Sequence, residues 1–187
     1  MSKKDWTKYA TVAFEAMKAN TTLWATGDPD TQRAVTKIFY DLVFSSGYQK
    51  TGLVSERAVA LHREGKGKQN DEDHILSPQF VARMIMDQPE TWLTDLRKFT
   101  QLFGVCRQTI LVTSTENHQL RQLTKNDRNT YTVAVPTDKK YAFLNINLMF
   151  KVDRKVISAI QVNQSHIDAI LQFPSELLTY ESQFVTV

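Results

Sequence analysis

The stretch GKGKQNDEDHILSPQF, residues 65–80, decides how this chain is interpreted, because it places acidic residues and a histidine directly before a helix start. Ser77 followed by Pro78 is typical of an N-cap with proline at the first helical position, and the apolar residues after it repeat with helical spacing. The residues before Asp73 are polar and rich in glycine, so a loop is expected there. Asp73 and His74 are therefore predicted to lie where a loop meets a helix.

Apolar periodicity predicts further helices on both sides of this stretch. Four helices are expected, over residues 5–19, 31–46, 78–88 and 92–103. Gly47 provides a stop for the second of them. The segment SERAVALHREGK, residues 55–66, fits a helix or a strand equally well, and the sequence leaves that choice open.

The C-terminal half alternates between strand and helix signals. Residues 106–113, CRQTILVT, are rich in β-branched side chains and predict a strand, which leads into a helix whose capping box is Thr113 to Glu116. Two strands are expected within residues 131–152, around a turn at residues 136–139, and one or two helices within residues 156–173.

Charge and cysteine content limit the classes of protein to which this chain can belong. The net charge is +3, but residues 97–155 carry 11 Lys or Arg against 4 Asp or Glu, which suits a polyanionic partner such as nucleic acid. Cys106 is the only cysteine, so an internal disulfide and a cysteine-based zinc site are excluded. No apolar run approaches the ~20 residues of a membrane span, and the start is too polar for a signal peptide. A cytoplasmic protein without a membrane partner is expected.

Two short motifs carry a resemblance to a known family. DHILSP, residues 73–78, and VTSTEN, residues 112–117, resemble the HNH (His-Me finger, ββα-metal) nucleases of bacteriophages and mobile elements, which include homing endonucleases. The first family motif is DH followed by an apolar residue and often a proline, and the last is a strand-to-helix segment that ends in a metal-binding Asn or His. The chain departs from the pattern at Gln108, where the family has asparagine, and in the longer separation of the motifs.

The resemblance implies a metal-dependent endonuclease that hydrolyses phosphodiester bonds of double-stranded DNA with Mg²⁺ or another divalent cation such as Mn²⁺. It implies His74 as general base, and Asp73 and Asn117 as metal ligands. Arg107 is a further catalytic candidate as a phosphate clamp, and it can equally be a salt-bridge partner. The basic half of the chain adds candidate DNA-binding residues, which are Arg121, Lys125, Lys139 and Lys140. The products would carry 5′-phosphate and 3′-hydroxyl ends.

Physical chemistry makes these roles reasonable without the family name. Asp73 and His74 are adjacent, so in an extended backbone they point to opposite sides, and a carboxylate on a metal and an imidazole facing water are compatible. Asn117 and His118 lie about 100° apart around a helix, so only one of them is expected to bind the metal. Asn117 is preferred, because it lies at the rim of the buried face, four residues before Arg121.

Other interpretations remain open. His74 can be a surface histidine, and Glu116 can act only as a helix cap. Asp138 and Lys140 have the DxK spacing of a different metal-dependent nuclease, and His62 with His74 would suit a metal-free ribonuclease. The chain can also be a non-enzymatic nucleic-acid-binding or phage regulatory protein.

The predicted fold is α+β in a single domain, residues 1–187. It consists of a helical N-terminal part (1–58), an interrupted ββα-metal-like nuclease core (59–124), and a basic β-hairpin with a C-terminal helix (125–187).

Overall fold

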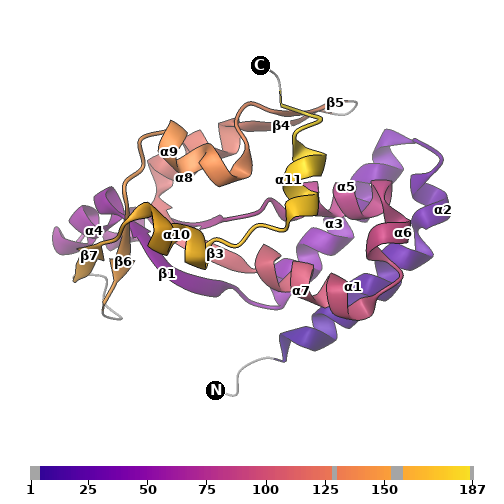
Figure 1. Ribbon diagram of the computed structural model, residues 1–187, viewed down its shortest axis with the longest axis horizontal. Coiled ribbons are helices and arrows are strands. Elements are labelled where there is room, and N and C mark those ends of the chain that lie inside the picture. Colours follow the sequence, from indigo (N-terminus) through magenta and orange to yellow (C-terminus); the bar gives the residue numbers. More distant parts are fainter. Residues whose placement is uncertain (1–4, 128–129, 153–157, 186–187) are drawn as a thin grey trace. The chain divides into compact units, whose positions relative to one another are not determined.

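The computed structural model describes residues 5–127, 130–152 and 158–185, without the side chains of residues 125–131. Helices and strands are mixed along the chain, which confirms the α+β class (Figure 1). Within the described residues, no helix is both long and apolar enough to cross a membrane.

The chain divides into two compact units, and each unit combines two separate segments. The first unit comprises Met1–Gln49 and Leu76–Gln108, and the second comprises Lys50–Ile75 and Thr109–Val187. The segment between the two sequence motifs therefore belongs with the N-terminal helices. Contiguous parts ending at residues 58 and 124, as predicted from the sequence, differ from this interleaved arrangement.

The first unit is helical. Its helices are α1 (Trp6–Ala19), α2 (Thr21–Trp24), α3 (Pro29–Ser45), α5 (Pro78–Asp87), α6 (Pro89–Trp92) and α7 (Leu96–Cys106). Helix α3 packs against α1 and α5, and α1 also packs against α7. Phe39 makes edge-to-face contacts with Phe99 and Phe103, and Phe14 makes one with Phe99. Large aromatic side chains from sequence-distant helices thus form the core of this unit.

Side-chain caps set the starts of the longer helices, and the cap at Ser77 was predicted from the sequence. Ser77 accepts a hydrogen bond from the Phe80 amide at the start of α5, with Pro78 at the first helical position. Asp28 caps α3 in the same way. Gly47 follows the end of α3 with a φ of 83°, a left-handed conformation that favours glycine.

The second unit holds the strands. Its elements are β1 (Gln49–Ser55), α4 (Glu56–Arg63), the 3₁₀ helix η1 (Gly67–Gln69), β2 (Asn70–His74), β3 (Gln108–Thr113), α8 (Ser114–Gln122), β4 (Thr124–Asp127), β5 (Thr130–Val133), the 3₁₀ helix η2 (Thr137–Lys139), α9 (Lys140–Phe143), β6 (Leu148–Lys151), β7 (Ala159–Gln161), α10 (Gln164–Ile170) and α11 (Ser175–Glu181).

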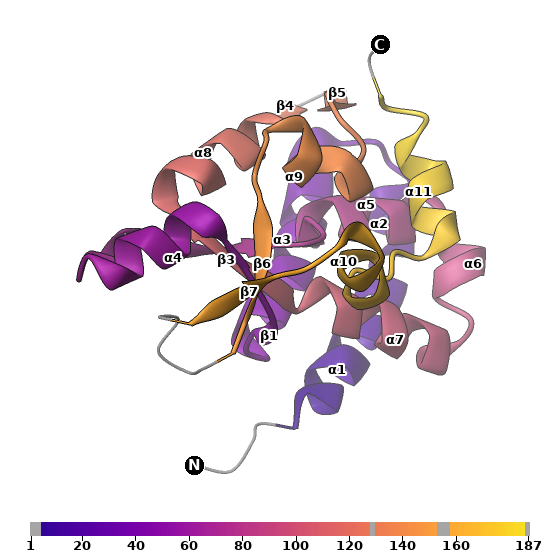
Figure 2. The same cartoon turned by 60° about the vertical axis from the view of Figure 1, so that its left-hand side comes forward.

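Five of these strands form one sheet in the order β2-β3-β1-β6-β7, and Figure 2 labels β3, β1, β6 and β7. Strands β2 and β3 are antiparallel, with Asp71 opposite Val112 and Asp73 opposite Ile110. Ile110 and Val112 are fully buried in an apolar cluster that also contains Tyr141. Strands β4 and β5 form a separate two-stranded sheet.

The observed elements differ from the sequence predictions in several places. Residues 70–74 form strand β2 rather than a polar loop, because β3 supplies a ladder for them. The segment left open between helix and strand contains helix α4. The hairpin predicted around residues 136–139 was wrong: these residues lead into η2 and α9, while β5 pairs with β4, and β6 pairs with β1 and β7. In the predicted helical segment 156–173, residues 156 and 157 lie outside the described part of the structure. Of its described residues, 159–161 form β7, and only Gln164–Ile170 is helical.

Candidate metal centre on strand β2 and helix α8

The start of helix α8 is held firmly beside strand β2. The Thr113 hydroxyl accepts from the Glu116 amide at 3.1 Å, and Glu116 Oε2 accepts from the Thr113 amide at 2.8 Å, which completes the predicted capping box. The Ser55 hydroxyl of β1 donates to the same Glu116 oxygen at 2.7 Å. Glu116 is 2% exposed, so this buried carboxylate acts as a structural cap, and α8 packs against β2.

Asn117 meets the acidic stretch through Asp71. The Asn117 Nδ2 group donates a hydrogen bond to Asp71 Oδ2, although the two residues are 46 positions apart. Asn117 is buried, whereas the Asp71 side chain is 49% exposed. Arg121 lies one turn further along α8, with its guanidinium 4.0 Å from the same Asp71 oxygen. The fold therefore brings Asn117 of the second motif into contact with Asp71, which lies two residues before the first motif.

Asp71 was not among the residues predicted for the site. The signal that could have found it is spacing: in a strand, residues two apart share a face, so Asp71 and Asp73 both face the side occupied by α8. That inference requires recognising residues 70–74 as a strand, which their polar composition conceals.

Asp73 is buried and already has a cation beside it. Its Oδ2 accepts from Lys140 Nζ at 2.8 Å and from the Tyr141 hydroxyl at 2.6 Å. Lys140 Nζ also donates to the His74 carbonyl at 2.8 Å, and the Lys140 side chain is 12% exposed. Burial, together with the negative charge of Asp73, raises the pKa of Tyr141, which keeps the phenol a proton donor. The ammonium of Lys140 thus neutralises Asp73 in this structure.

His74 is the last residue of β2 and lies opposite Thr109 in β3. Because side chains alternate along a strand, His74 lies on the face opposite to Asp71 and Asp73. This agrees with the expectation that Asp73 and His74 point to opposite sides. His74 is half-buried, and its carbonyl is held by Lys140.

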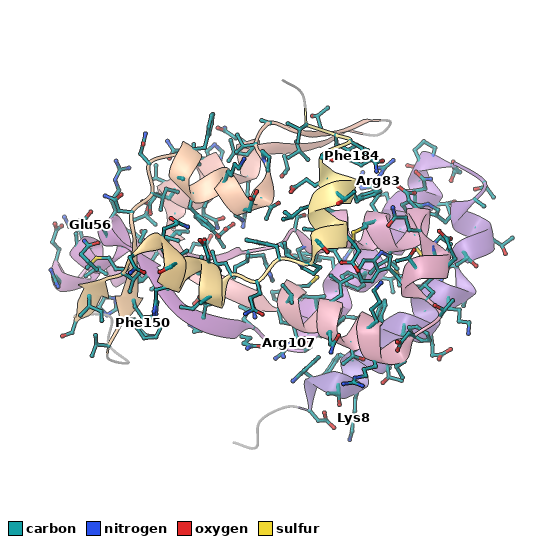
Figure 3. The ribbon with its side chains drawn as sticks, in the orientation of Figure 1. Lys8, Glu56, Arg83, Arg107, Phe150 and Phe184 are labelled. Carbon is teal, nitrogen blue, oxygen red and sulfur yellow. The ribbon has the colours of Figure 1, made fainter. Side chains whose placement is uncertain are left out.

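The basic residues predicted from the sequence fall into different environments. The Arg107 guanidinium donates to the Ser46 hydroxyl and the Gly47 carbonyl, and it lies 4.8 Å from the Trp6 ring. Figure 3 labels Arg107 among the side chains. Arg107 is 7% exposed, and burial lowers its pKa. These contacts lie within the first unit, and they account for Arg107 as a packing residue.

The remaining candidate DNA-binding residues belong to the second unit. Arg121 and Lys139 are exposed, and Lys140 is engaged with Asp73 rather than presented at a hairpin tip. Lys125 lies in β4, but its side chain is outside the described part of the structure. Only two of these four cationic side chains are therefore described as exposed to a polyanion.

The oxygen donors near β2 suit a divalent cation that keeps several of its waters better than one enclosed entirely by protein ligands. Among the described residues, no group of three or more His, Cys, Asp and Glu side chains is placed to hold a metal ion. Mg²⁺ does not need one, because it keeps several waters and binds through one or two carboxylates together with substrate phosphates. The half-exposed Asp71 carboxylate provides an oxygen donor of the required kind. Asn117 directs its Nδ2 group toward Asp71, so its amide oxygen could bind the same cation only after the amide turned over. Asp73 could join them only if Lys140 moved.

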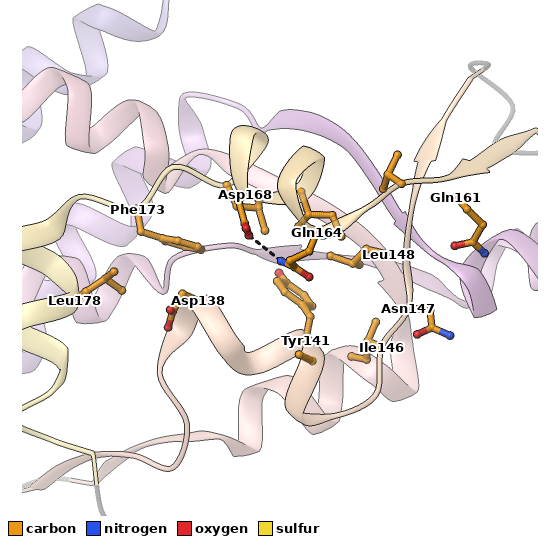
Figure 4. A pocket seen from close by; sticks show the side chains of 14 residues that line it. Asp138, Tyr141, Ile146, Asn147, Leu148, Gln161, Gln164, Asp168, Phe173 and Leu178 are labelled. Carbon is orange, nitrogen blue, oxygen red and sulfur yellow. Dashed lines mark hydrogen bonds between the residues drawn. The ribbon is translucent and has the colours of Figure 1, made fainter.

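Tyr141 also borders a cavity of about 530 Å³ in the second unit (Figure 4). The residues that line it include Asp138 and Asp168, and Gln164 donates to Asp168 at 2.7 Å. None of its lining residues that the structure describes is a lysine or an arginine, so this cavity does not favour a phosphate group.

No protein-family model, curated protein or solved structure matches the chain.

Proposed function

We propose that the protein is a metal-dependent DNA endonuclease that hydrolyses phosphodiester bonds. The observation that supports this most directly is the contact between Asp71 and Asn117, which joins the DEDH stretch to the strand-to-helix motif. Strands β2 and β3 followed by α8 have the connectivity expected of an interrupted ββα-metal core. An accidental pair of short motifs would not be expected to converge in this way.

In this proposal, the chain holds a Mg²⁺ ion through Asp71 and Asn117. A bound Mg²⁺ would stabilise negative charge on the leaving oxygen of the phosphodiester. Asp71 contributes the formal negative charge and Asn117 a neutral oxygen, while the buried cap at Glu116 keeps Asn117 in place. Arg121 lies on the exposed side of Asp71, where it can contact a phosphate of the substrate.

The family resemblance assigns His74 as the general base. In this structure its side chain lies on the face of β2 opposite to Asp71 and Asn117, so this role requires the end of β2 to rearrange when DNA binds. A neutral imidazole accepts a proton efficiently near neutral pH, because the reference pKa of histidine is about 6.5. Lys140 fixes the backbone of this residue through the His74 carbonyl. Lys139 is exposed next to Lys140 and is assigned to the DNA backbone, where a lysine neutralises phosphate without reading sequence.

The test is cleavage of supercoiled plasmid DNA by the full chain with Mg²⁺ and with EDTA. Cleavage is expected only with the metal, and it should disappear in His74→Ala while DNA binding persists. His118→Ala is the matched control, because His118 is exposed on helix α8 and bonds only to Gln122 among the described residues. Equal loss of cleavage in His118→Ala would refute the assignment. Cyclic phosphate products would point instead to metal-free ribonuclease chemistry with His62.

A second candidate function is nucleic-acid binding without catalysis. The observation that favours it is the buried pair between Asp73 and Lys140, which occupies the carboxylate that the family resemblance assigns to the metal. If the wild-type protein binds DNA and cleaves none with Mg²⁺ or Mn²⁺, this second function replaces the first.

A further inference from the structure

A second, smaller cavity lies in the second unit, and its lining includes lysine side chains. It measures about 220 Å³ and is bordered by β1, β2, β3 and β6 together with α4 and η1. We call it the sheet pocket, and its polar lining residues are Lys50, His62, Asn70, Glu72, Thr109 and Lys151. Asn70 and Glu72 alternate along β2 with Asp71 and Asp73, so the sheet pocket is on the opposite face of β2 from the candidate metal centre.

Two buried polar groups of the sheet pocket have no hydrogen-bond partner among the described residues. Thr109 is 1% exposed, and its hydroxyl has no partner among the described residues. Asn70 donates from Nδ2 to the Ala58 carbonyl at 3.0 Å, but its Oδ1 has no partner in the same part of the structure. Buried groups of this kind usually have a partner, often a water or a ligand. One hydroxyl and one acceptor are thus available to a ligand.

The charges around these groups favour an anion. Lys50 pairs with Glu72 at 2.6 Å, which leaves Lys151 as the uncompensated cation of the lining. Lys151 is half-buried and forms no ion pair within the described residues. A Cβ atom at Gly67 would lie 2.5 Å from Nδ1 of His62. The absence of a side chain at Gly67 therefore lets the His62 ring approach, and that ring can also donate to an anion.

We propose that the sheet pocket binds a phosphorylated pentose. Lys151 would neutralise the phosphate, the Thr109 hydroxyl would hydrogen-bond to it, and Asn70 Oδ1 would accept from a sugar hydroxyl. The volume is below the roughly 300 Å³ at which pockets for drug-sized ligands begin, which favours a sugar phosphate over a dinucleotide. The ligand can be a free nucleoside monophosphate or the 5′-phosphorylated end of a DNA strand. The inference does not rest on the endonuclease proposal, because the binding requires no metal.

Isothermal titration calorimetry of the full chain in EDTA tests this binding. Thymidine 5′-monophosphate should bind at least about ten-fold more tightly than thymidine, because the charge-assisted hydrogen bonds go to the phosphate. Lys151→Ala should weaken the binding about ten-fold or more, and Lys8→Ala, which removes an exposed lysine of the first unit, should leave it unchanged. Equal affinity for both ligands, or equal loss in both variants, overturns the proposal.

Thr109→Val separates binding from folding. It replaces a hydroxyl without a described partner by a methyl group of similar shape, so the melting temperature should stay the same or rise. Affinity for thymidine 5′-monophosphate should fall about five-fold, and unchanged affinity overturns the role of Thr109. Binding of a dT oligonucleotide with a 5′-phosphate is compared with binding of the same oligonucleotide with a 5′-hydroxyl. This comparison distinguishes a DNA end from a free nucleoside monophosphate as the ligand. Binding of neither the monophosphate nor the phosphorylated oligonucleotide at about 1 mM overturns the whole inference.

Discussion

The buried pair between Lys140 and Asp73 allows a sharp test of both stability and metal binding. The pair is 2.8 Å long, and its side chains are 12% and 9% exposed. Removing one member of such a pair leaves an uncompensated buried charge, which costs about 3–5 kcal/mol. In Lys140→Met the Tyr141 hydroxyl still donates to Asp73, so the lower end of this range, about 3 kcal/mol, is expected.

Thermal unfolding in EDTA measures this loss. For a chain of this length, each kcal/mol lowers the melting temperature by about 2–4 °C, so Lys140→Met should melt roughly 6–12 °C below wild type. Lys139→Met is the matched control, because Lys139 is exposed and a surface change usually stays within about 0.5 kcal/mol. The double variant Lys140→Met with Asp73→Asn should recover much of the loss, because no charge is then left unpaired.

Lys140→Met also tests whether Asp73 can bind a metal ion. If Asp73 can bind a divalent cation, removing the ammonium of Lys140 frees it, and the variant should gain stability from the ion. A site with a dissociation constant of about 1 mM would gain about 1.4 kcal/mol at about 10 mM Mg²⁺. Wild type, in which Lys140 competes for Asp73, should gain less.

Two results would refute this reasoning. If Lys140→Met and Lys139→Met melt at the same temperature, the pair contributes nothing and Lys140 is not buried as described. If Mg²⁺ and Mn²⁺ stabilise Lys140→Met no more than wild type, Asp73 is not a metal ligand, and the candidate centre is limited to Asp71 and Asn117.

Three further predictions use other parts of the second unit. Asn117→Ala should raise the Mg²⁺ concentration needed for cleavage while DNA binding in EDTA stays intact, and an unchanged requirement in plasmid assays removes Asn117 as a ligand. Lys139→Ala should weaken binding alike on unrelated duplexes and make the salt slope shallower by about 0.9, and a change confined to one sequence contradicts a backbone contact. Burial raises the pKa of Glu181, whose carboxylate accepts from Thr137, so its contribution to the unfolding free energy falls as pH rises from its unfolded pKa through its folded one. Glu181→Gln should flatten that fall in melts from about pH 4 to about pH 7, and an identical pH slope contradicts it.

Local signals in the sequence were sufficient where a structure depends on neighbouring residues. The cap at Ser77 and the capping box at Thr113 to Glu116 were predicted and are observed, because each forms within four residues of chain. The convergence of Asn117 with the acidic stretch followed from the family resemblance. The particular partner, Asp71, did not.

Long-range pairing explains the parts that sequence reasoning missed. Strand β2 has the polar sequence NDEDH, and its extended structure depends on a partner strand that begins 34 residues after it ends. Lys140 was expected at an exposed turn, yet its partner Asp73 is 67 residues away. No local pattern distinguishes a lysine that reaches a buried carboxylate from one that remains in water, because both have the same neighbours in sequence.

The register of β2 against β3 determines which chemistry each face of the sheet carries. Ile110 and Val112 are fully buried, and pairing opposite them places Asp73 and Asp71 on the side of α8. A slip of one residue would exchange the faces, turning the carboxylates toward the sheet pocket and Glu72 toward Asn117. The contacts of β2 on its two faces oppose that slip, because it would separate Asp73 from Lys140 and Tyr141, and Glu72 from Lys50. The position of the candidate metal ligands therefore depends on partners that lie far away in the sequence, and not on the acidic stretch alone.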